Sequence, residues 1–422
     1  MKLRSALPFA VATVMVLAAA SHCFGQEKAG RRPAIRLARA IADRIIQDTD
    51  LSLRQVPLKD AAGNEAPQAR VTELAVKPDA IYRRESYAEW TYYNGTVLLS
   101  LLGLSRASGE PAYEAFVRRV CDFTLAHLDT FRSQYATLRM NRGADYRMFQ
   151  RTMLDYTGGP VLPYQELLPG SNDGRLRTLV GEMGRYVAEG QVRLPDRTLC
   201  RPEPPSYTIW ADDLFMGLPC LVRMGEQSGV QAYFDDAATQ VVNFNRYLAD
   251  SVSGLYRHAY FVSRKQQSPF AWGRANGWVI WAETEVLLHT PKTHPSYQAI
   301  AEIFRRHMKA LVAVQGSSGL WHQVLDHSES FEETSCSAMF MIGLARGLKM
   351  GLLDETYRAP LQKAWEGLRS KITEGPIVKD ICRGTGIGEE LSFYLTRERF
   401  DNDPHGLGAV ITALTEADGL VE

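Results

Sequence analysis

The sequence lacks any excess of charge of one sign and any long basic tract. Its 48 lysines and arginines balance 48 aspartates and glutamates over 422 residues, so the formal net charge is zero. A protein that binds nucleic acid needs a basic patch or stripe to meet the phosphates. The balance therefore argues against a nucleic-acid partner, and nothing in the sequence indicates a protein partner.

Cysteine is scarce, with six in the whole chain, and none are paired in a Cys-x-x-Cys motif or set among histidines at zinc spacing. Cys121, Cys220 and Cys336 lie in apolar helical stretches and are expected to be small core residues. Cys200 and Cys382 lie in predicted loops and could form a disulfide, which the sequence leaves open. We expect no metal, no cofactor and no disulfide scaffold.

Long hydrophobic runs are confined to the N-terminus. Two basic residues precede an apolar run from Ala6 to Ala20, and small and polar residues follow as far as Gly25. This pattern predicts a secretory signal peptide at residues 1–25, too short for a membrane span. We expect export through the Sec pathway to the periplasm, with a mature domain at 26–422. Cys23 leaves open a lipoprotein, which would then be held at a membrane.

Apolar residues recur at the spacing of amphipathic helices along nearly all of the mature chain. We predict helices at 34–48, 86–107, 111–137, 149–169, 174–189, 211–226, 230–249, 271–289, 295–314, 332–351, 354–372 and 404–418. Twelve helices without an alternating strand–helix pattern suggest six helical hairpins. An open solenoid would show a short sequence repeat, and none is found. The predicted fold is therefore all-α, a closed (α/α)6 barrel formed by a single domain.

One long stretch, from Gln191 to Tyr207, has no helical periodicity and contains four prolines. It immediately precedes two adjacent carboxylates, Asp212 and Asp213. A stiffened loop beside a candidate site often carries substrate contacts. The alternative is a plain connector.

Asp212 and Asp213 stand in the segment TIWADDLFMG, at the start of an apolar helix. Acidic residues favour first helical turns because the exposed N–H groups and the macrodipole attract negative charge. Helix capping is therefore the ordinary interpretation, and proton chemistry is the alternative. The same choice applies to Asp155 in RTMLDYTGGP, which opens another predicted helix.

Two further segments combine polar and aromatic residues where a plain helix would not need them. They are GLYRHAYFVSRKQQSPFAWGRANGW and GLWHQVLDHSESFEETSCSAMF, and their candidate residues are His258, Trp272, Arg274, Trp278, Trp321 and His322. Each alone has a structural alternative, such as a hydrogen-bonded histidine or a cation–π pair in the wall. Together with the acids, these residue types are what an anionic sugar requires. The segment ICRGTGIG lacks the strand and the Lys-Ser/Thr of a nucleotide loop.

Three motifs occur in a fixed order. They are W-x-D-x-L-F-M at Trp210–Met216, W-x-R-x-N-G-W at Trp272–Trp278, and G-L-W-H-Q-V-L-D with E-T-S at Gly319–Asp326 and Glu333–Ser335. With these motifs the chain resembles glycoside hydrolase family 105, the unsaturated rhamnogalacturonyl hydrolases, and more distantly family 88. The resemblance runs from Trp90 to Gly408. The family fold is an (α/α)6 barrel, in agreement with the helix pattern.

The resemblance implies roles for individual residues. Asp212, two residues after the tryptophan of its motif, would be the catalytic acid, and Asp155 would assist it. Asp213 would tune its neighbour, since adjacent carboxylates hinder each other's ionisation. An arginine suits a carboxylate through a two-point fork, and a tryptophan suits the apolar face of a sugar. The implied substrate-binding residues are Trp210, Asp213, His258, Trp272, Arg274, Trp278, Trp321 and His322.

The function implied by the resemblance is an exo-acting glycosidase. It would remove a Δ4,5-unsaturated uronic acid, galacturonate being the first expectation, from lyase-generated oligosaccharides such as rhamnogalacturonan fragments, by hydration of the C4=C5 double bond. One alternative is an unsaturated glucuronyl hydrolase acting on other lyase products. Another is a sugar isomerase or epimerase, which usually directs two histidines at the sugar. A non-catalytic sugar-binding protein would be expected to lose the acid at position 212.

Overall fold

The computed structural model describes residues 32–57, 69–71, 80–84, 86–138, 142–202 and 207–421. The predicted signal peptide and Cys23 lie outside the described residues, as do positions 203–206 of the predicted loop. None of the helices in the described residues has the length and hydropathy that a membrane span requires.

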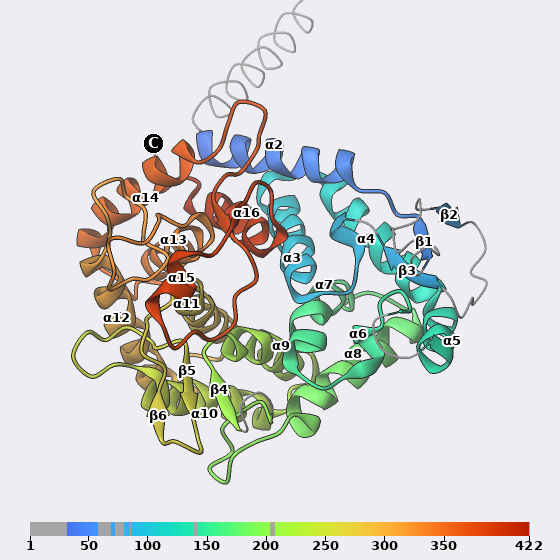
Figure 1. The fold of residues 1–422 in the computed structure, drawn as a ribbon, viewed down its shortest axis with the longest axis horizontal. Coiled ribbons are helices and arrows are strands. Elements are labelled where there is room, and N and C mark those ends of the chain that lie inside the picture. Colours follow the sequence, from blue (N-terminus) through green and yellow to red (C-terminus); the bar gives the residue numbers. More distant parts are fainter. Residues whose placement is uncertain are drawn as a thin grey trace, which may run out of the picture.

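Six helices of the described chain form an inner ring in which each contacts the next and the last contacts the first (Figure 1). They are α3 (Tyr92–Ser108), α7 (Gly158–Leu167), α9 (Asp213–Ser228), α11 (Gly273–His289), α13 (Thr334–Lys349) and α16 (Pro404–Ala417). These helices are apolar around most of their circumference, as expected of helices buried on all sides. In α11, every residue from Gly273 to Leu287 is buried.

An outer layer of helices covers the ring, each packed on two consecutive inner helices (Figure 1). They are α2 (Pro33–Asp48), α4 (Pro111–Ala126), α8 (Gly174–Arg185), α10 (Gln231–Leu248), α12 (Tyr297–Ala313) and α14 (Arg358–Ser370). Their sequences bury one stripe only; α2, for example, buries Ala34, Ala38, Ile41 and Ile45 at helical spacing. The predicted (α/α)6 barrel is confirmed.

The two ends of the barrel differ in their connections. From an inner helix to the next outer helix the chain turns tightly, as at Gly109–Glu110 between α3 and α4. From an outer helix to the next inner helix it makes long excursions that contain strands and short helices. All the long connections therefore gather where the inner helices begin, and binding residues are commonly found on such loops.

The excursions form three small antiparallel sheets within the described residues, with strand orders β2-β1-β3, β4-β5-β6 and β7-β8. The strands are β1 (Leu53–Pro57), β2 (Ala69–Val71), β3 (Ala80–Arg84), β4 (Thr208–Trp210), β5 (Ala259–Phe261), β6 (Gln266–Gln267), β7 (Ile381–Cys382) and β8 (Arg399–Phe400). The short helices are α5 (Leu128–Leu138), α6 (Arg147–Gln150) and α15 (Leu391–Leu395). Single turns lie at Ser86–Ala88, Leu154–Tyr156, Tyr186–Gly190 and Glu355–Tyr357.

Two predicted helices have different boundaries in the structure. The helix predicted at 86–107 begins only at Tyr92, because the hydroxyl of Thr91 caps it by accepting a hydrogen bond from the backbone N–H of Asn94. The helix predicted at 111–137 is broken at His127 into α4 and α5.

A third difference concerns the surroundings of Asp155. The residues predicted as one helix at 149–169 form α6, a 3-10 turn that carries Asp155, and α7. A Cβ atom on Gly158 would lie 1.8 Å from the carbonyl oxygen of Met216 in α9, so only glycine allows α7 to begin so close to α9. This approach places the turn of Asp155 against the first residues of α9.

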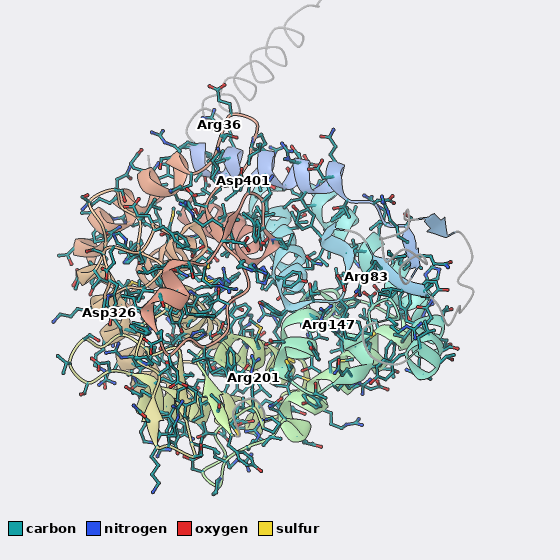
Figure 2. The ribbon with its side chains drawn as sticks, in the orientation of Figure 1. Arg36, Arg83, Arg147, Arg201, Asp326 and Asp401 are labelled. Carbon is teal, nitrogen blue, oxygen red and sulfur yellow. The ribbon has the colours of Figure 1, made fainter. Side chains whose placement is uncertain are left out.

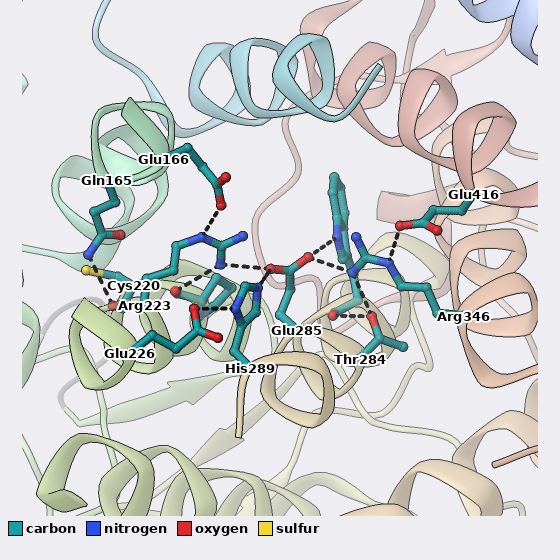
Figure 3. Close-up of polar contacts among 12 residues, drawn as sticks. Gln165, Glu166, Cys220, Arg223, Glu226, Thr284, Glu285, His289, Arg346 and Glu416 are labelled. Atoms are coloured by element: carbon teal, nitrogen blue, oxygen red, sulfur yellow. Dashed lines mark hydrogen bonds and ion pairs between the residues drawn. The ribbon is translucent and has the colours of Figure 1, made fainter. Parts of the chain in front are cut away.

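The end of the barrel with the tight turns is closed by paired charges (Figure 3). Glu285 of α11 accepts a hydrogen bond from Arg346 of α13 at 2.6 Å and lies 2.8 Å from Arg223 of α9. Arg223 also donates to Glu166 at 2.8 Å, and Arg346 donates to Glu416 at 2.9 Å. Each buried charge thus has partners of opposite sign, which buried ions need in order to stay charged.

Candidate active site

All six inner helices begin at the end of the barrel that carries the long connections. Helix N-termini offer N–H groups and partial positive charge, so this end favours an anionic ligand. Side chains of Thr91, Glu333 and Asp403 cap α3, α13 and α16. In contrast, no side chain caps α7, α9 or α11. Asp155 and Asp212 lie beside two of these uncapped ends.

Asp212 immediately precedes α9, but its side chain makes no capping hydrogen bond. Its Oδ2 atom is buried without a hydrogen-bond partner and lies 3.4 Å from Nε2 of His258, which has none either. The side chain of Asp212 is 15% exposed, so the carboxyl group remains reachable. Helix capping, the ordinary interpretation of this acid, therefore does not apply. A reachable carboxyl group with an unused oxygen is suited to proton transfer.

Asp213 is 1% exposed, and both of its carboxylate oxygens accept hydrogen bonds from the guanidinium of Arg201, at 2.9 Å from Nε and 2.6 Å from Nη2. Burial raises the pKa of Asp213 to about 6; Arg201 opposes this rise, and the charges of Asp155 and Asp212 add to it. Arg201 occupies both oxygens of Asp213, and a contact of this residue with the substrate stays a prediction. The main cause of the raised pKa is burial and not the adjacent carboxylate.

Asp155 shares the same arginine. Nη2 of Arg201 donates to Oδ1 of Asp155 at 2.9 Å, and the Asp155 side chain is 19% exposed. Burial raises the pKa of Asp155, Arg201 opposes the rise, and the charge of Asp212 increases it. Two carboxylates therefore bind one guanidinium, and the charge of Asp212 acts on it as well. Arg201 lies where β4 meets the start of α9 (Figure 2).

His258, directly before β5, is completely buried. Its Nδ1 lies 2.8 Å from the hydroxyl of Tyr394 in α15, and that hydroxyl accepts a hydrogen bond from the backbone N–H of Gly388. The tyrosine hydroxyl can donate its own proton to Nδ1, and in that tautomer the imidazole proton lies on Nε2. This N–H faces Oδ2 of Asp212.

Trp210 and Trp272 both contact His258, with ring centroids 5.6 Å and 4.5 Å from the imidazole. The indole N–H of each is buried without a partner. Native proteins rarely leave buried donors unpaired, so such groups call for an explanation such as an absent ligand. The structure brings Trp210, Asp212, His258 and Trp272 together, and the two indoles offer donors to substrate oxygens.

The sequence matches the Glycosyl Hydrolase Family 88 model over residues 69–420. The chain belongs to Glycosyl Hydrolase Family 88. This membership confirms the predicted class, a glycosidase, and the family resemblance of the motifs.

Two curated relatives share part of the sequence. Unsaturated rhamnogalacturonyl hydrolase YesR of Bacillus subtilis (strain 168) is 32% identical over 186 residues, which cover 44% of this chain and 52% of the relative. Unsaturated 3S-rhamnoglycuronyl hydrolase of Alteromonas sp. (strain LOR) is 26% identical over 239 residues, or 55% and 54% of the two chains. The matches therefore span about half the length of these relatives.

The fold is shared with a solved glycoside hydrolase from family 105 of C. acetobutylicum ATCC 824. The TM-score is 0.67 at 23% identity, covering 78% of this chain and 94% of the other. At this identity the likeness concerns the fold alone.

Arg274 of this family 88 chain does not present a free fork to the site. The residue is 1% exposed, and its guanidinium donates to the carbonyl oxygens of Cys382 and Arg383, the latter at 2.7 Å. It also lies over the ring of Trp272 at 4.7 Å. The fork anchors the chain at Cys382 and Arg383, and a contact of Arg274 with a sugar carboxylate stays a prediction.

Trp278, Trp321 and His322 also make structural contacts. Trp278 is 1% exposed and packs against Phe215 at 4.9 Å, beneath the site. The indole of Trp321 is fully buried and donates to the carbonyl oxygen of Leu311 at 2.7 Å. His322 contacts the carbonyl oxygen of Ser330 at 2.5 Å. None of these contacts is with the acids, and a role of the three residues in binding stays a prediction.

Four residues near the acids were not predicted from the sequence, and they are Tyr92, Arg201, Tyr394 and His405. Burial and the charges of Asp155 and Asp212 raise the pKa of Tyr92, and the ring of His405 lies 5.7 Å from that of Tyr92. Arg201 lay in the loop where contacts were expected, and Tyr92 and His405 lay in the resembling segments. No feature of the sequence LSFYLT marks Tyr394.

No group of three or more His, Cys, Asp or Glu side chains in the described residues is arranged to hold a metal ion. The described cysteines are buried free thiols, so Cys200 and Cys382 are not bridged. Cys382 instead accepts a hydrogen bond from Gln323.

Proposed function

We propose that the protein is an exo-acting glycosidase that removes a Δ4,5-unsaturated uronic acid from the non-reducing end of short oligosaccharides. Unsaturated galacturonate on rhamnogalacturonan fragments is the proposed first substrate, as the name of the Bacillus subtilis relative suggests. The observation that carries the proposal is the unpartnered Oδ2 of Asp212, set 3.4 Å from Nε2 of His258 in a family 88 chain.

The proposed reaction is hydration of the double bond. The usual two-carboxylate scheme acts at the anomeric carbon, and some glycosidase families depart from it. The C4=C5 bond of an unsaturated uronate is an enol ether, which takes a proton at C4. Asp212 would deliver this proton and leave an oxocarbenium centre at C5. Water would then add its oxygen at C5 and lose a proton to a carboxylate.

The product of that addition is a hemiketal at C5. Its ring C5–O bond breaks to give a ketone at C5 and a hydroxyl at C1, which makes C1 a hemiacetal of the next sugar. This hemiacetal collapses to an aldehyde and releases the next sugar as an alcohol. One water is consumed, and proton exchange between the two carboxyl groups and solvent restores the acid and the base.

Each remaining group has a proposed task. Asp155 would hold the water and accept its proton, since its carboxylate is reachable and belongs to the same cluster as Asp212. The indole N–H groups of Trp210 and Trp272 would donate hydrogen bonds to substrate oxygens. The uncapped starts of α7, α9 and α11 favour the negative charge of a uronate.

Turnover in isotopically labelled water tests the mechanism. We expect loss of the ultraviolet absorbance of the unsaturated uronate and label in the C5 carbonyl of the first product. Label at C1, or efficient cleavage of a saturated galacturonide, would contradict hydration.

A panel of lyase products tests the substrate. Unsaturated galacturonyl-rhamnose should be cleaved faster than unsaturated glucuronyl disaccharides of equal length. The reverse preference would favour an unsaturated glucuronyl hydrolase.

Export to the periplasm is proposed as well, on the strength of the N-terminal pattern alone. Mass spectrometry of the mature N-terminus tests it. Cleavage after Gly25 supports a soluble exported form, a lipid on Cys23 supports the lipoprotein, and an intact N-terminus contradicts both.

A further inference from the structure

The cluster of carboxylates beside α9 has an unequal distribution of partners. Arg201 binds Asp213 through two nitrogens and Asp155 through one, whereas Oδ2 of Asp212 has no hydrogen-bond partner. Two of the three acids are therefore matched to a positive charge, and the third is left to react.

Contacts of both its backbone and its side chain hold Arg201 in place between Asp155 and Asp213. Its backbone exchanges two hydrogen bonds of 2.9 Å with Thr208, next to Trp210 in β4. Its guanidinium lies 4.5 Å from the centre of the Trp210 ring, and its side chain is 10% exposed. The planar fork of arginine fixes the orientation of both carboxylates, which a lysine would not do.

Other charged and titratable groups face the cluster from every neighbouring element. They are Tyr92 of α3, Tyr186 after α8, His258 before β5, Arg274 of α11, Tyr394 of α15 and His405 of α16. Arg274 is engaged with backbone carbonyls, so Arg201 is the cation in direct contact with the acids.

We propose that Arg201 is a positioning residue that holds Asp155 and Asp213 as carboxylates, so that Asp155 can accept the proton of the water, and leaves Oδ2 of Asp212 without a hydrogen-bond partner. The proposal rests on the proposed function, which makes Asp212 the proton donor and Asp155 the acceptor. It also explains how three neighbouring acids acquire different roles: two are bound to a guanidinium and the third is not.

The consequence of losing Arg201 has a definite sign. In Arg201→Gln, burial of Asp155 and Asp213 is no longer opposed, so the pKa values of both rise. Asp155 then keeps a proton at pH values where the wild type has a carboxylate to accept the proton of the water. The base is neutral in part of the pH range where the wild type is active, and the acidic limb of the pH–rate profile moves to higher pH.

A purely structural role for Arg201 would give a different result. If the arginine only tethers its loop to α9, its loss lowers stability without moving the pH profile of the folded fraction. Arg223→Gln supplies a matched control, because Arg223 is also buried between two carboxylates, Glu166 and Glu285, but at the opposite end of the barrel.

The first experiment compares kcat/KM against pH for the wild type, Arg201→Gln, Arg201→Lys and Arg223→Gln, each normalised to folded protein. The acidic limb of the Arg201→Gln profile should lie higher by about one to three pH units, because Asp155 must be ionised to accept the proton. Arg201→Lys should restore part of the shift because it keeps the charge, and Arg223→Gln should match the wild type. A limb in Arg201→Gln that coincides with that of the wild type would overturn the proposal.

The second experiment needs no substrate. Carbon-13 NMR of protein labelled at the aspartate carboxyl carbons reports which acids are ionised, with Asp155→Asn, Asp212→Asn and Asp213→Asn for assignment. At pH 7 the wild type should show Asp155 and Asp213 ionised, and Arg201→Gln should show them protonated. Unchanged titrations would overturn the role of Arg201, whereas a wild type that cleaves no unsaturated oligosaccharide would overturn only the proposed function.

Discussion

The two ends of the barrel are built from the same six inner helices, but they differ in how their buried polar and charged groups are paired. Where the helices end, Glu285 lies between Arg223 and Arg346, and each arginine has a second carboxylate (Figure 3). Where the helices begin, Oδ2 of Asp212 and Nε2 of His258 are buried without partners. Oε2 of Glu285 has no hydrogen bond either, but it lies 2.8 Å from Arg223 and its charge is balanced. At the start of the helices the indole N–H groups of Trp210 and Trp272 are unpaired as well, and a ligand can complete these hydrogen bonds.

Helix direction explains the charges at each end. Arg346 and Lys349 lie in the last turn of α13 and His289 in the last turn of α11, near the negative ends of the helix dipoles. A cavity of about 380 Å³ also lies at this end, but the charges around it are paired with one another. In this structure, buried polar atoms without partners therefore indicate the active site better than the presence of a cavity does.

The largest expected effect comes from Asp212→Asn, which keeps the shape of the side chain and removes its proton. Turnover should fall by about 10²-fold to 10⁴-fold, the usual contribution of a general acid, while substrate still binds. Single-turnover kinetics and equilibrium binding of an unsaturated disaccharide measure the two effects separately.

A matched control for Asp212→Asn is Asp236→Asn, which removes a buried carboxylate of α10 that is bound to Arg193. It should lower stability and leave turnover per folded molecule unchanged. An active Asp212→Asn beside an inactive Asp213→Asn would show that the catalytic position is 213.

The next largest effect is expected from Asp155→Asn. The amide can still hold a water but cannot accept its proton, and it also loses the charge that pairs with Arg201. Activity should fall by about 10-fold to 100-fold and remain measurable, because the proton can leave by another route. A variant as inactive as Asp212→Asn would make the two acids equal partners.

The contrast between the two ends also explains what the sequence could reveal. Helical periodicity predicts both layers of the barrel, because α2 needs one apolar stripe and α11 is buried all round. Motif resemblance predicts Asp212, Trp210, His258 and Trp272, which the structure brings together. The 3-10 turn at Asp155 was missed because it depends on the contact between Gly158 and Met216, which lie far apart in the chain.

Residues whose role depends on tertiary partners were beyond prediction. Arg274 looked suited to a substrate carboxylate, but the carbonyl oxygens of Cys382 and Arg383, more than 100 residues away, occupy its fork. In the sequence nothing distinguishes Arg201 from other loop arginines, and its role follows only from its hydrogen bonds to Asp155 and Asp213. A sequence pattern can indicate that a charged side chain needs a partner, but only the folded structure shows which residue that partner is.

At the other end of the barrel, Glu285→Gln should reduce stability more than activity. The change leaves Arg223 and Arg346 with one carboxylate each, and breaking a buried ion pair typically costs about 3–5 kcal/mol. Urea unfolding should show a loss of about 3 kcal/mol, with kcat per folded molecule unchanged. A variant that folded normally but lost activity would mean that the two ends are coupled.

The smallest expected effect is on the pH dependence of stability, which should differ between Glu285 at one end of the barrel and Asp213 at the other. Arg223 and Arg346 hold the pKa of Glu285 well below its ordinary value despite burial, so its contribution to stability is present above about pH 4.5 and is lost on acidification. Burial raises the pKa of Asp213 to about 6, so the folded protein keeps a proton that the unfolded chain releases near pH 4. The contribution of Asp213 to stability therefore falls as the pH rises from 4 to 6.

Substitution of each acid should remove its own pH dependence. Across pH 4 to 7 the unfolding free energy of Asp213→Asn should improve relative to the wild type by on the order of 2 kcal/mol, since the variant has no carboxyl group to ionise. For Glu285→Gln the deficit relative to the wild type should instead grow as the pH rises from 3 to 5 and then stay constant. Urea unfolding of the three proteins at each pH measures both differences. If the unfolding free energies of all three proteins changed with pH in parallel, neither carboxyl group would have the shifted pKa that its contacts predict. If the two differences from the wild type changed with pH in opposite directions, ionisation of Asp213 would destabilise the start of the inner helices and ionisation of Glu285 would stabilise their end.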